Sequence, residues 1–471
     1  MSTPEKIEPT ADLAPPPARR WRPLILRLHF YAGVFVAPFI LIAAVTGGLY
    51  AIAPTLESVV YRDLLHTDNT GPALPVSDQI LAAQAERPDL TVAAVRPATE
   101  AGDTTKVLFT DPSLGESKRT AVFVDPASAT PVGESTVYGS SGSLPLRTWI
   151  SELHRTLHLG EIGRLYSELA ASWLGVVALG GLFLWVERFR RRRSRSDARL
   201  FTVDRATRGR RRTLNLHGAG GAWIVVGLVF LSATGLTWST YAGANITDVR
   251  SALRWTTPTV DTDLTGHAGH TDDEHAGHVG HGASDVATAS PVDVRQIDGV
   301  LAVARENDVT GPVEASIPAS GDTAFQVSQL RDPWVFSTDS IAVDGASDRV
   351  VDVQRFADWP LAAKLTTWGI SLHMGVLFGL VSQLALLALA VVLVAVIVGG
   401  YRMWFQRKPS RTGGMPVGRP PQRGALRRLS PGAVVGLAMV TVAVGWFVPL
   451  LGVSLLAFLA VDAVTGRLRR A

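Results

Sequence analysis

Four histidines stand at points where a polar segment meets a long apolar stretch, and they fall into two pairs. His29 and His217 each follow a leucine and open one apolar stretch, and His158 and His373 do the same at two others. At a constant offset within each pair, further residues match: Gly33 with Gly221, Thr46 with Thr234, Gly47 with Gly235, Pro145 with Pro360, Ser167 with Ser382 and Leu169 with Leu384. These matches indicate an internal duplication with one histidine at the entrance of each helix.

An imidazole in an apolar helix is energetically costly unless it is paired or bound to a metal, so histidines in such positions indicate function. The chain contains no cysteine, which excludes disulfides, thiolate metal sites and thioether-linked haem. Two axial nitrogens from opposing helices, with small residues beside them, are what a b-type haem needs. The glycines expected to give the macrocycle room are Gly33, Gly160, Gly220, Gly221 and Gly375. The alternative is that these histidines form hydrogen bonds at the membrane interface and that the glycines serve helix packing.

Long uncharged stretches must position these histidines. Residues 35–50, 169–186, 223–238 and 376–398 carry no charge, and with its flanks each stretch is near the ~20 residues that a helix needs to cross a bilayer. Together with a content of 47% hydrophobic residues, they predict an α-helical polytopic membrane protein with four core transmembrane helices and a C-terminal hydrophobic hairpin.

The predicted segments follow one another without overlap. They are a disordered cytoplasmic tail (1–20), a first span (21–54), a first outer module (55–145), a second span (146–187), a basic loop (188–212), a third span (213–241), a second outer module (242–360), a fourth span (361–405) and a C-terminal segment (430–465). Pro449 within the C-terminal segment favours a hairpin over a single tilted span.

Each of the two outer segments has the pattern of a small α+β module. In the first, a helix is predicted over 76–85 and strands over 90–95, 105–109 and 120–124, with the turn Asp125-Pro126 ending the last strand. In the second, a helix is predicted over 294–305 and strands over 313–317, 324–328 and 340–343.

The distribution of charge predicts the orientation. Between Arg188 and Arg212 there are twelve arginines and two acids, and cytoplasmic loops of membrane proteins are enriched in basic residues. We therefore expect this loop and the N-terminus in the cytoplasm, both modules outside, and a multi-pass protein of the inner or plasma membrane. A loop held between two spans needs no nucleic acid to explain its charge.

This orientation sorts the histidines into two ligand pairs. His29 and His217 open helices at the cytoplasmic end and can ligate one haem b, and His373 can ligate a second at the outer end with either His154 or His158. The sequence predicts one continuous helix through His154 and His158, which would place them one turn apart on one face.

A segment rich in histidine, 266–281, is a separate signal. Its acids are Asp272, Asp273 and Glu274, and its histidines are His267, His270, His275, His278 and His281. Imidazoles on a flexible chain bind Cu(II), Ni(II) or Zn(II). The alternative is a solvated linker without a specific metal role.

The residues around the four helix entrances resemble the PepSY-associated transmembrane helix family over about residues 20–405. They are Arg27-Leu28-His29 with Gly33, Leu153-His154-Arg155 with Leu159-Gly160, Leu216-His217 with Gly220 and Gly221, and Leu372-His373-Met374-Gly375 with Gly379. The family pattern selects His154 in the second helix, whereas the internal repeat selects His158. The family includes iron-regulated inner-membrane proteins and di-haem ferric-siderophore reductases.

The resemblance implies that the two outer segments are PepSY-type modules. It also implies b-type haem bound by histidines, electron transfer across the membrane and metal reduction outside. We therefore expect a metalloreductase that reduces an extracytoplasmic ferric chelate, in particular a ferric siderophore, for iron acquisition. The sequence has no glycine-rich dinucleotide fingerprint and no phosphate loop, so a quinol or a cytoplasmic flavoprotein must supply the electrons. Two alternatives stay open: a regulatory or protease-inhibitory membrane protein, and an accessory protein that binds copper, nickel or zinc.

Overall fold

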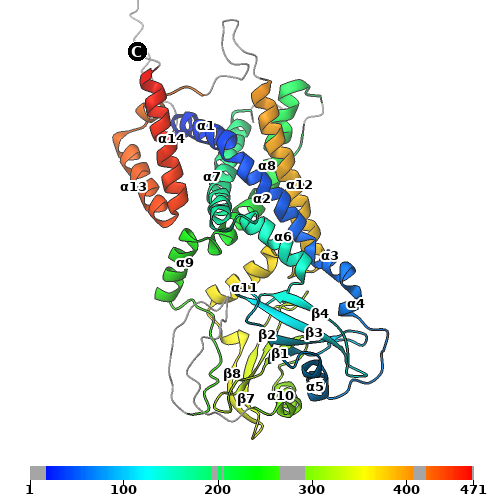
Figure 1. Cartoon of the computed structure of the whole chain (residues 1–471). Helices are drawn as coiled ribbons and strands as arrows, with labels where there is room; N and C mark the ends of the chain where they lie inside the picture. Colours follow the sequence, from blue (N-terminus) through cyan, green and yellow to red (C-terminus); the bar gives the residue numbers. More distant parts are fainter. Residues whose placement is uncertain (1–16, 193–199, 204–205, 266–291, 407–420, 469–471) are drawn as a thin grey trace, which may run out of the picture. The chain divides into compact units, whose positions relative to one another are not determined.

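The computed structural model describes residues 17–192, 200–203, 206–265, 292–406 and 421–468 (Figure 1). The chain divides into two compact units. Unit 1 comprises Met1–Ile42, Glu168–Leu236 and Val391–Ala471, and unit 2 comprises Ala43–Ser167 and Thr237–Ala390. Each unit thus brings together parts of the chain that are far apart in sequence.

Four helices within the described residues are long and apolar enough to cross a membrane. They are α7 (Gly160–Arg192), α8 (Gly209–Thr237), α12 (Leu380–Phe405) and α14 (Pro449–Leu468). Helices α1 (Pro17–Phe35) and α2 (Ala37–Ala51) together make a fifth candidate span, bent by 61°. The chain is a polytopic membrane protein.

The bend between α1 and α2 has a local cause in Pro38. Proline has no N–H, and its ring removes the carbonyl four residues earlier from the helical hydrogen bonds. That carbonyl belongs to Val34, and it accepts a hydrogen bond of 2.9 Å from the hydroxyl of Tyr401 in α12 instead. The first predicted span is therefore two helices joined at Val36 rather than one.

The second predicted span is also broken. Helix α6 (Pro145–Thr156) ends at Leu157 and His158, which have φ values of 50° and 56°, and α7 begins after them. The break is tight, because a side chain at Gly163 would collide with the carbonyl of Thr156. The prediction of one continuous helix through His154 and His158 is wrong.

The fourth predicted span begins with a separate helix, α11 (Leu361–His373). Between α11 and α12, Gly375 and Gly379 have φ values of 75° and 54°, a backbone conformation that favours glycine. The C-terminal segment forms α13 (Pro431–Phe447) and α14, and the backbones approach so closely that a Cβ on Gly452 would lie 2.6 Å from the carbonyl oxygen of Gly445. This is the helical hairpin, one of the two predicted alternatives.

Unit 2 contains one eight-stranded antiparallel sheet in the order β4-β3-β2-β1-β5-β6-β7-β8. The strands are β1 (Thr91–Arg96), β2 (Thr105–Thr110), β3 (Lys118–Asp125), β4 (Thr130–Tyr138), β5 (Val313–Ser316), β6 (Phe325–Gln329), β7 (Ser340–Asp344) and β8 (Arg349–Gln354). The two halves of the sheet join where β1 pairs with β5, with Val95 opposite Ala315. The sequence predicted six of these strands and did not predict the shared sheet.

The two strands that the sequence did not predict, β4 and β8, form the outer edges of the sheet. Edge strands bury few side chains, so their apolar pattern is weak. Strand β4 also contains Pro131 and Gly133, which are unusual inside a strand. Asp125-Pro126 therefore opens a hairpin into a further strand instead of ending the sheet.

Helices α5 (Val76–Glu86) and α10 (Ile297–Glu306) pack against the same face of the sheet (Figure 1). Ile80 of α5 and Val300 of α10 belong to one hydrophobic core with Phe109 and Phe325 of the sheet. The carboxylate of Asp298 in α10 accepts hydrogen bonds from the first backbone N–H groups of α5, at 2.8 and 3.3 Å. The remaining short helices are α3 (Ala53–Val60), α4 (Arg62–Leu65), α9 (Tyr241–Ala252), η1 (Val294–Gln296), η2 (Phe356–Asp358) and η3 (Ala425–Arg428).

Candidate functional site

In unit 1, His29 of α1 and His217 of α8 are oriented by the same kind of hydrogen bond. Nδ1 of His29 lies 3.0 Å from the carbonyl oxygen of Val177, and Nδ1 of His217 lies 2.8 Å from that of Val396. A carbonyl oxygen can only accept, so Nδ1 must carry the hydrogen in both rings. In a neutral imidazole, Nε2 then has the free lone pair, which is the form that binds a metal.

The two rings of unit 1 lie edge to face, at a centroid distance that one metal can bridge. Their centroids are 6.2 Å apart and their planes are inclined by 78°. Two imidazoles on opposite sides of one iron would have centroids about 6 Å apart, from two metal–nitrogen bonds of about 2 Å and about 1 Å from each nitrogen to its ring centre. The centroid distance between His29 and His217 therefore fits two imidazoles that would bind one haem iron.

In unit 2, His154 of α6 is oriented by α2. Its Nδ1 lies 3.0 Å from the hydroxyl of Thr46, and that hydroxyl donates to the carbonyl of Ala43 at 3.3 Å. The hydroxyl hydrogen is thereby engaged, so Nδ1–H of His154 is the donor to Thr46 and Nε2 is left with its lone pair. The ring of Tyr50 lies parallel to that of His154, with centroids 6.4 Å apart.

His373, the last residue of α11, lies in the same unit, with its ring edge-on to Trp238 at 5.1 Å between centroids. His154 lies close enough to His373 to act on it electrostatically. Unit 2 therefore brings these two histidines near each other.

His158 is placed differently from the other four. It lies in the break between α6 and α7, is exposed, and has its Nδ1 3.4 Å from a carboxylate oxygen of Glu152. Its ring also lies 5.0 Å from that of Trp149. The structure thus brings His154, and not His158, against the apolar helices.

A glycine lies against each of three histidine rings, and these glycines were not predicted. A Cβ added to Gly181 would lie 2.9 Å from Cε1 of His29, one on Gly400 3.6 Å from Cε1 of His217, and one on Gly47 3.0 Å from Cε1 of His154. Each glycine lies four residues after the residue whose carbonyl accepts the hydrogen bond. Val177 precedes Gly181 and accepts from His29, and Val396 precedes Gly400 and accepts from His217. Ala43 precedes Gly47 and accepts from the hydroxyl of Thr46, which in turn contacts His154. The missing side chain lets the imidazole reach a carbonyl on the flank of a helix. The sequence signal was the glycine pairs Gly47-Gly48, Gly180-Gly181 and Gly399-Gly400 inside apolar stretches.

The five glycines that the sequence predicted for haem packing do not lie against a histidine ring. Cβ atoms added to Gly33 and Gly221 would meet nothing within 4 Å, and one on Gly220 would lie 3.2 Å from Val396. Gly160 and Gly375 have positive φ and belong to the breaks before α7 and α12. Their contact with a macrocycle stays a prediction.

The family model of the PepSY-associated TM region matches residues 26–407. The chain belongs to this family. The match includes all five histidines considered above and ends before the C-terminal hairpin. No curated protein matched the chain. The PepSY-associated family predicted from the sequence is thus confirmed.

The structure also bears on metal sites other than haem. Across the described residues, no group of three or more histidine, cysteine, aspartate or glutamate side chains could hold a metal ion. The five histidines of the segment 266–281 lie outside the described residues. A metal site there stays a prediction of the sequence.

Proposed function

We propose that this PepSY-associated membrane protein is a haem-b-containing electron-transfer protein that reduces an extracytoplasmic metal complex, in particular a ferric siderophore, for iron acquisition. The observation that carries the proposal is the His29–His217 pair, whose Nδ1 atoms are both anchored and whose rings are 6.2 Å apart. Hydrogen-bonded outer nitrogens are the usual support of metal-binding imidazoles.

In this proposal His29 and His217 hold one haem and His154 and His373 hold a second. When bound, each haem accepts and gives up one electron at a time. The chain's own residues fix the imidazole tautomer through Val177, Val396 and Thr46. The four histidines lie on or next to apolar helices, a surrounding that would limit the access of water to a bound haem.

The proposal includes an orientation and an evolutionary origin. The halves α5 with β1–β4 and α10 with β5–β8 have the same order of one helix and four antiparallel strands, which supports two PepSY-type modules that arose by duplication. The arginine-rich loop 188–212 supports a cytoplasmic N-terminus and modules outside an inner or plasma membrane. The electron donor is then a quinol or a cytoplasmic flavoprotein, and the acceptor is the ferric chelate outside.

Absorbance tests the proposal directly. The purified full-length protein is expected to be red, to contain two haems per chain and, once reduced, to be reoxidised by a ferric hydroxamate chelate. His217→Ala and His373→Ala should each remove one haem and leave the other. His66→Ala is the control, because His66 pairs with Asp103 at 3.1 Å at the surface of unit 2. A wild-type protein without haem would contradict the proposal.

A further inference from the structure

Arg147 is a buried cation with two donor atoms that have no hydrogen-bond partner among the described residues. It lies in the first turn of α6, is 7% exposed, and has Nη1 3.8 Å from a carboxylate oxygen of Glu57 in α3. The other carboxylate oxygen of Glu57 accepts the backbone N–H of Leu144 at 2.7 Å. Within the described part of the chain, Nε and Nη2 of Arg147 are buried and have no hydrogen-bond partner. A buried charge with unpaired donors is costly, which indicates that a further partner binds there.

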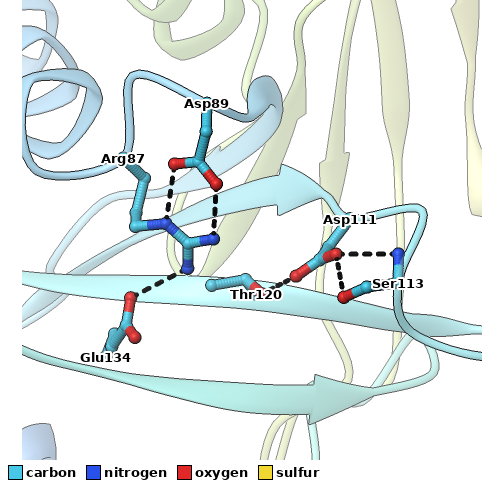
Figure 2. Close-up of polar contacts among 6 residues, drawn as sticks. All are labelled: Arg87, Asp89, Asp111, Ser113, Thr120 and Glu134. Atoms are coloured by element: carbon cyan, nitrogen blue, oxygen red, sulfur yellow. Dashed lines mark hydrogen bonds and ion pairs between the residues drawn. The ribbon is translucent and has the colours of Figure 1, made fainter.

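The two unpaired atoms form one edge of the guanidinium group. Their N–H bonds run parallel and match the two oxygens of one carboxylate. Arg87 shows the same arrangement with its partners in place (Figure 2): Nε and Nη2 donate to the two oxygens of Asp89 at 3.0 and 2.9 Å, and Nη1 donates to Glu134 at 3.1 Å. In Arg147, Glu57 lies on the Nη1 side as Glu134 does in Arg87, at the longer distance of 3.8 Å. Among the described residues, none corresponds to Asp89. The edge therefore suits a carboxylate that the described residues do not supply.

The position of Arg147 on α6 connects this edge to the histidine pair of unit 2. Arg147 precedes His154 by seven residues, which is about two turns, so both project from one face at a separation of about 10 Å along the helix. The face packs along α2 and α3, with His154 against Thr46 and Arg147 near Glu57. Haem carries two propionate carboxylates on one edge of an apolar macrocycle. A macrocycle bound at His154 can direct that edge along α6 towards Arg147.

We propose that Arg147 binds a propionate of the haem held by His154 and His373, through Nε–H and Nη2–H, while Glu57 holds Nη1. The inference rests on the proposed function and adds a positioning residue to it. The contact fixes the rotation of the macrocycle about its axial ligands, because one edge is tied to α6. Arg147 ligates no iron, so its effect is on haem retention and orientation.

The experiment compares haem b with its dimethyl ester, in which both propionates are blocked. Each full-length protein also carries His29→Ala, so that only the haem of unit 2 is observed. The rate of haem transfer to apomyoglobin is followed by absorbance. With Arg147 present, the ester is expected to leave about 10- to 100-fold faster than haem b, the range for a charge-assisted hydrogen bond. Arg147→Met should lose haem b nearly as fast as the ester.

Arg96→Met is the matched control. Arg96 is 9% exposed, but its guanidinium has partners: Nε donates to Glu314 at 2.6 Å and Nη2 to the carbonyl of Ser140 at 2.9 Å. This variant removes a buried charge from the same unit and should keep the full preference for haem b. Arg147→Lys keeps the charge without the parallel donors, and its preference should be smaller than that of the arginine protein.

Equal transfer rates of haem b and the ester with Arg147 present would overturn the inference, and this comparison needs no Arg147 variant to fold. A full preference retained in Arg147→Met or Arg147→Lys would overturn it as well. In these outcomes the protein still holds haem, so the proposed function stands. A wild-type protein that holds no haem would overturn both.

Discussion

In unit 1, His29 and His217 both donate from Nδ1 to a backbone carbonyl of a helix, whereas in unit 2 His154 donates to the hydroxyl of Thr46. A backbone carbonyl is present whatever the residue, so the orientation of the unit 1 pair depends on the path of the helices and on the glycines beside them. The backbone carbonyl of Ala43 also acts on His154, but its nearest hydrogen-bond partner is a side chain, the hydroxyl of Thr46. Unit 2 is therefore the pair in which the loss of one supporting hydroxyl can loosen a ring without touching a ligand.

The largest difference is expected between two histidines that lie only four residues apart. His154→Ala should reduce the haem content from two per chain to one, because it removes a proposed ligand of the haem in unit 2. His158→Ala should leave both haems, because His158 is exposed and lies near Glu152 rather than against a helix of the apolar region. The haem-to-protein ratio, measured by pyridine haemochrome, checks both. The opposite pattern would return the ligand role to His158.

Much of the fold could be predicted from the sequence, because burial in lipid or in a sheet leaves a local pattern. The strand predicted over 90–95 corresponds to β1, which covers Thr91–Arg96, and the apolar stretch 376–398 lies mostly within α12. The breaks and the edges could not be predicted. Leu157 and His158 have positive φ although they are not glycines. Strand β4 is half exposed, so its apolar residues do not alternate clearly with polar ones.

The candidate site was predictable to a similar degree. His29, His217 and His373 stand out because an imidazole at the start of an apolar stretch is unusual. The family pattern selects His154 and the internal repeat selects His158. The break at Leu157, which places only His154 on α6, favours the family pattern. Gly181, Gly400 and Arg147 were missed, because their role depends on which helices become neighbours. For example, the contact of His29 with the carbonyl of Val177 cannot be predicted from the sequence, because the two residues lie on different helices.

The next largest effect is expected at Thr46, whose hydroxyl supports His154 as a backbone carbonyl supports His29. Thr46→Val keeps the shape of the side chain and removes the acceptor of Nδ1–H of His154. Loss of such an outer hydrogen bond costs about 10- to 100-fold in affinity at metal sites. We therefore expect haem to leave unit 2 faster by about this factor, measured by transfer to apomyoglobin, while the haem of unit 1 is unaffected.

Thr46→Ser is the control for this prediction, because it keeps the hydroxyl and loses only a methyl group. Its transfer rate should stay within about threefold of the wild type, the range of a small packing change. If Thr46→Ser and Thr46→Val lose haem equally fast, packing at this position and not the hydrogen bond holds His154. The comparison between the two units would then lose its basis.

The smallest effect is expected in unit 1 at Gly181, which leaves room for the ring of His29 because it has no side chain. A Cβ on Gly181 would lie 2.9 Å from Cε1 of His29, closer than ordinary contact, whereas a Cβ on Gly180 would lie 3.6 Å from Ile25 and 4.0 Å from Nδ1 of His29. Gly181→Ala should displace the imidazole and lengthen its hydrogen bond to Val177, at a cost of about 1 kcal/mol, the lower end for overpacking.

Gly180→Ala adds the same methyl group to the same helix and gains the same helix propensity, so it isolates the contact with His29. The measurements are the thermal midpoint of haem release and the electron paramagnetic resonance signal of the oxidised haem of unit 1. Gly181→Ala should lower the midpoint by a few degrees relative to Gly180→Ala and shift that signal, because the plane of His29 rotates. Gly400→Ala should behave like Gly180→Ala, since its Cβ would lie 3.6 Å from His217. Identical midpoints and signals for Gly181→Ala and Gly180→Ala would show that the orientation of His29 does not require the absence of a side chain at Gly181.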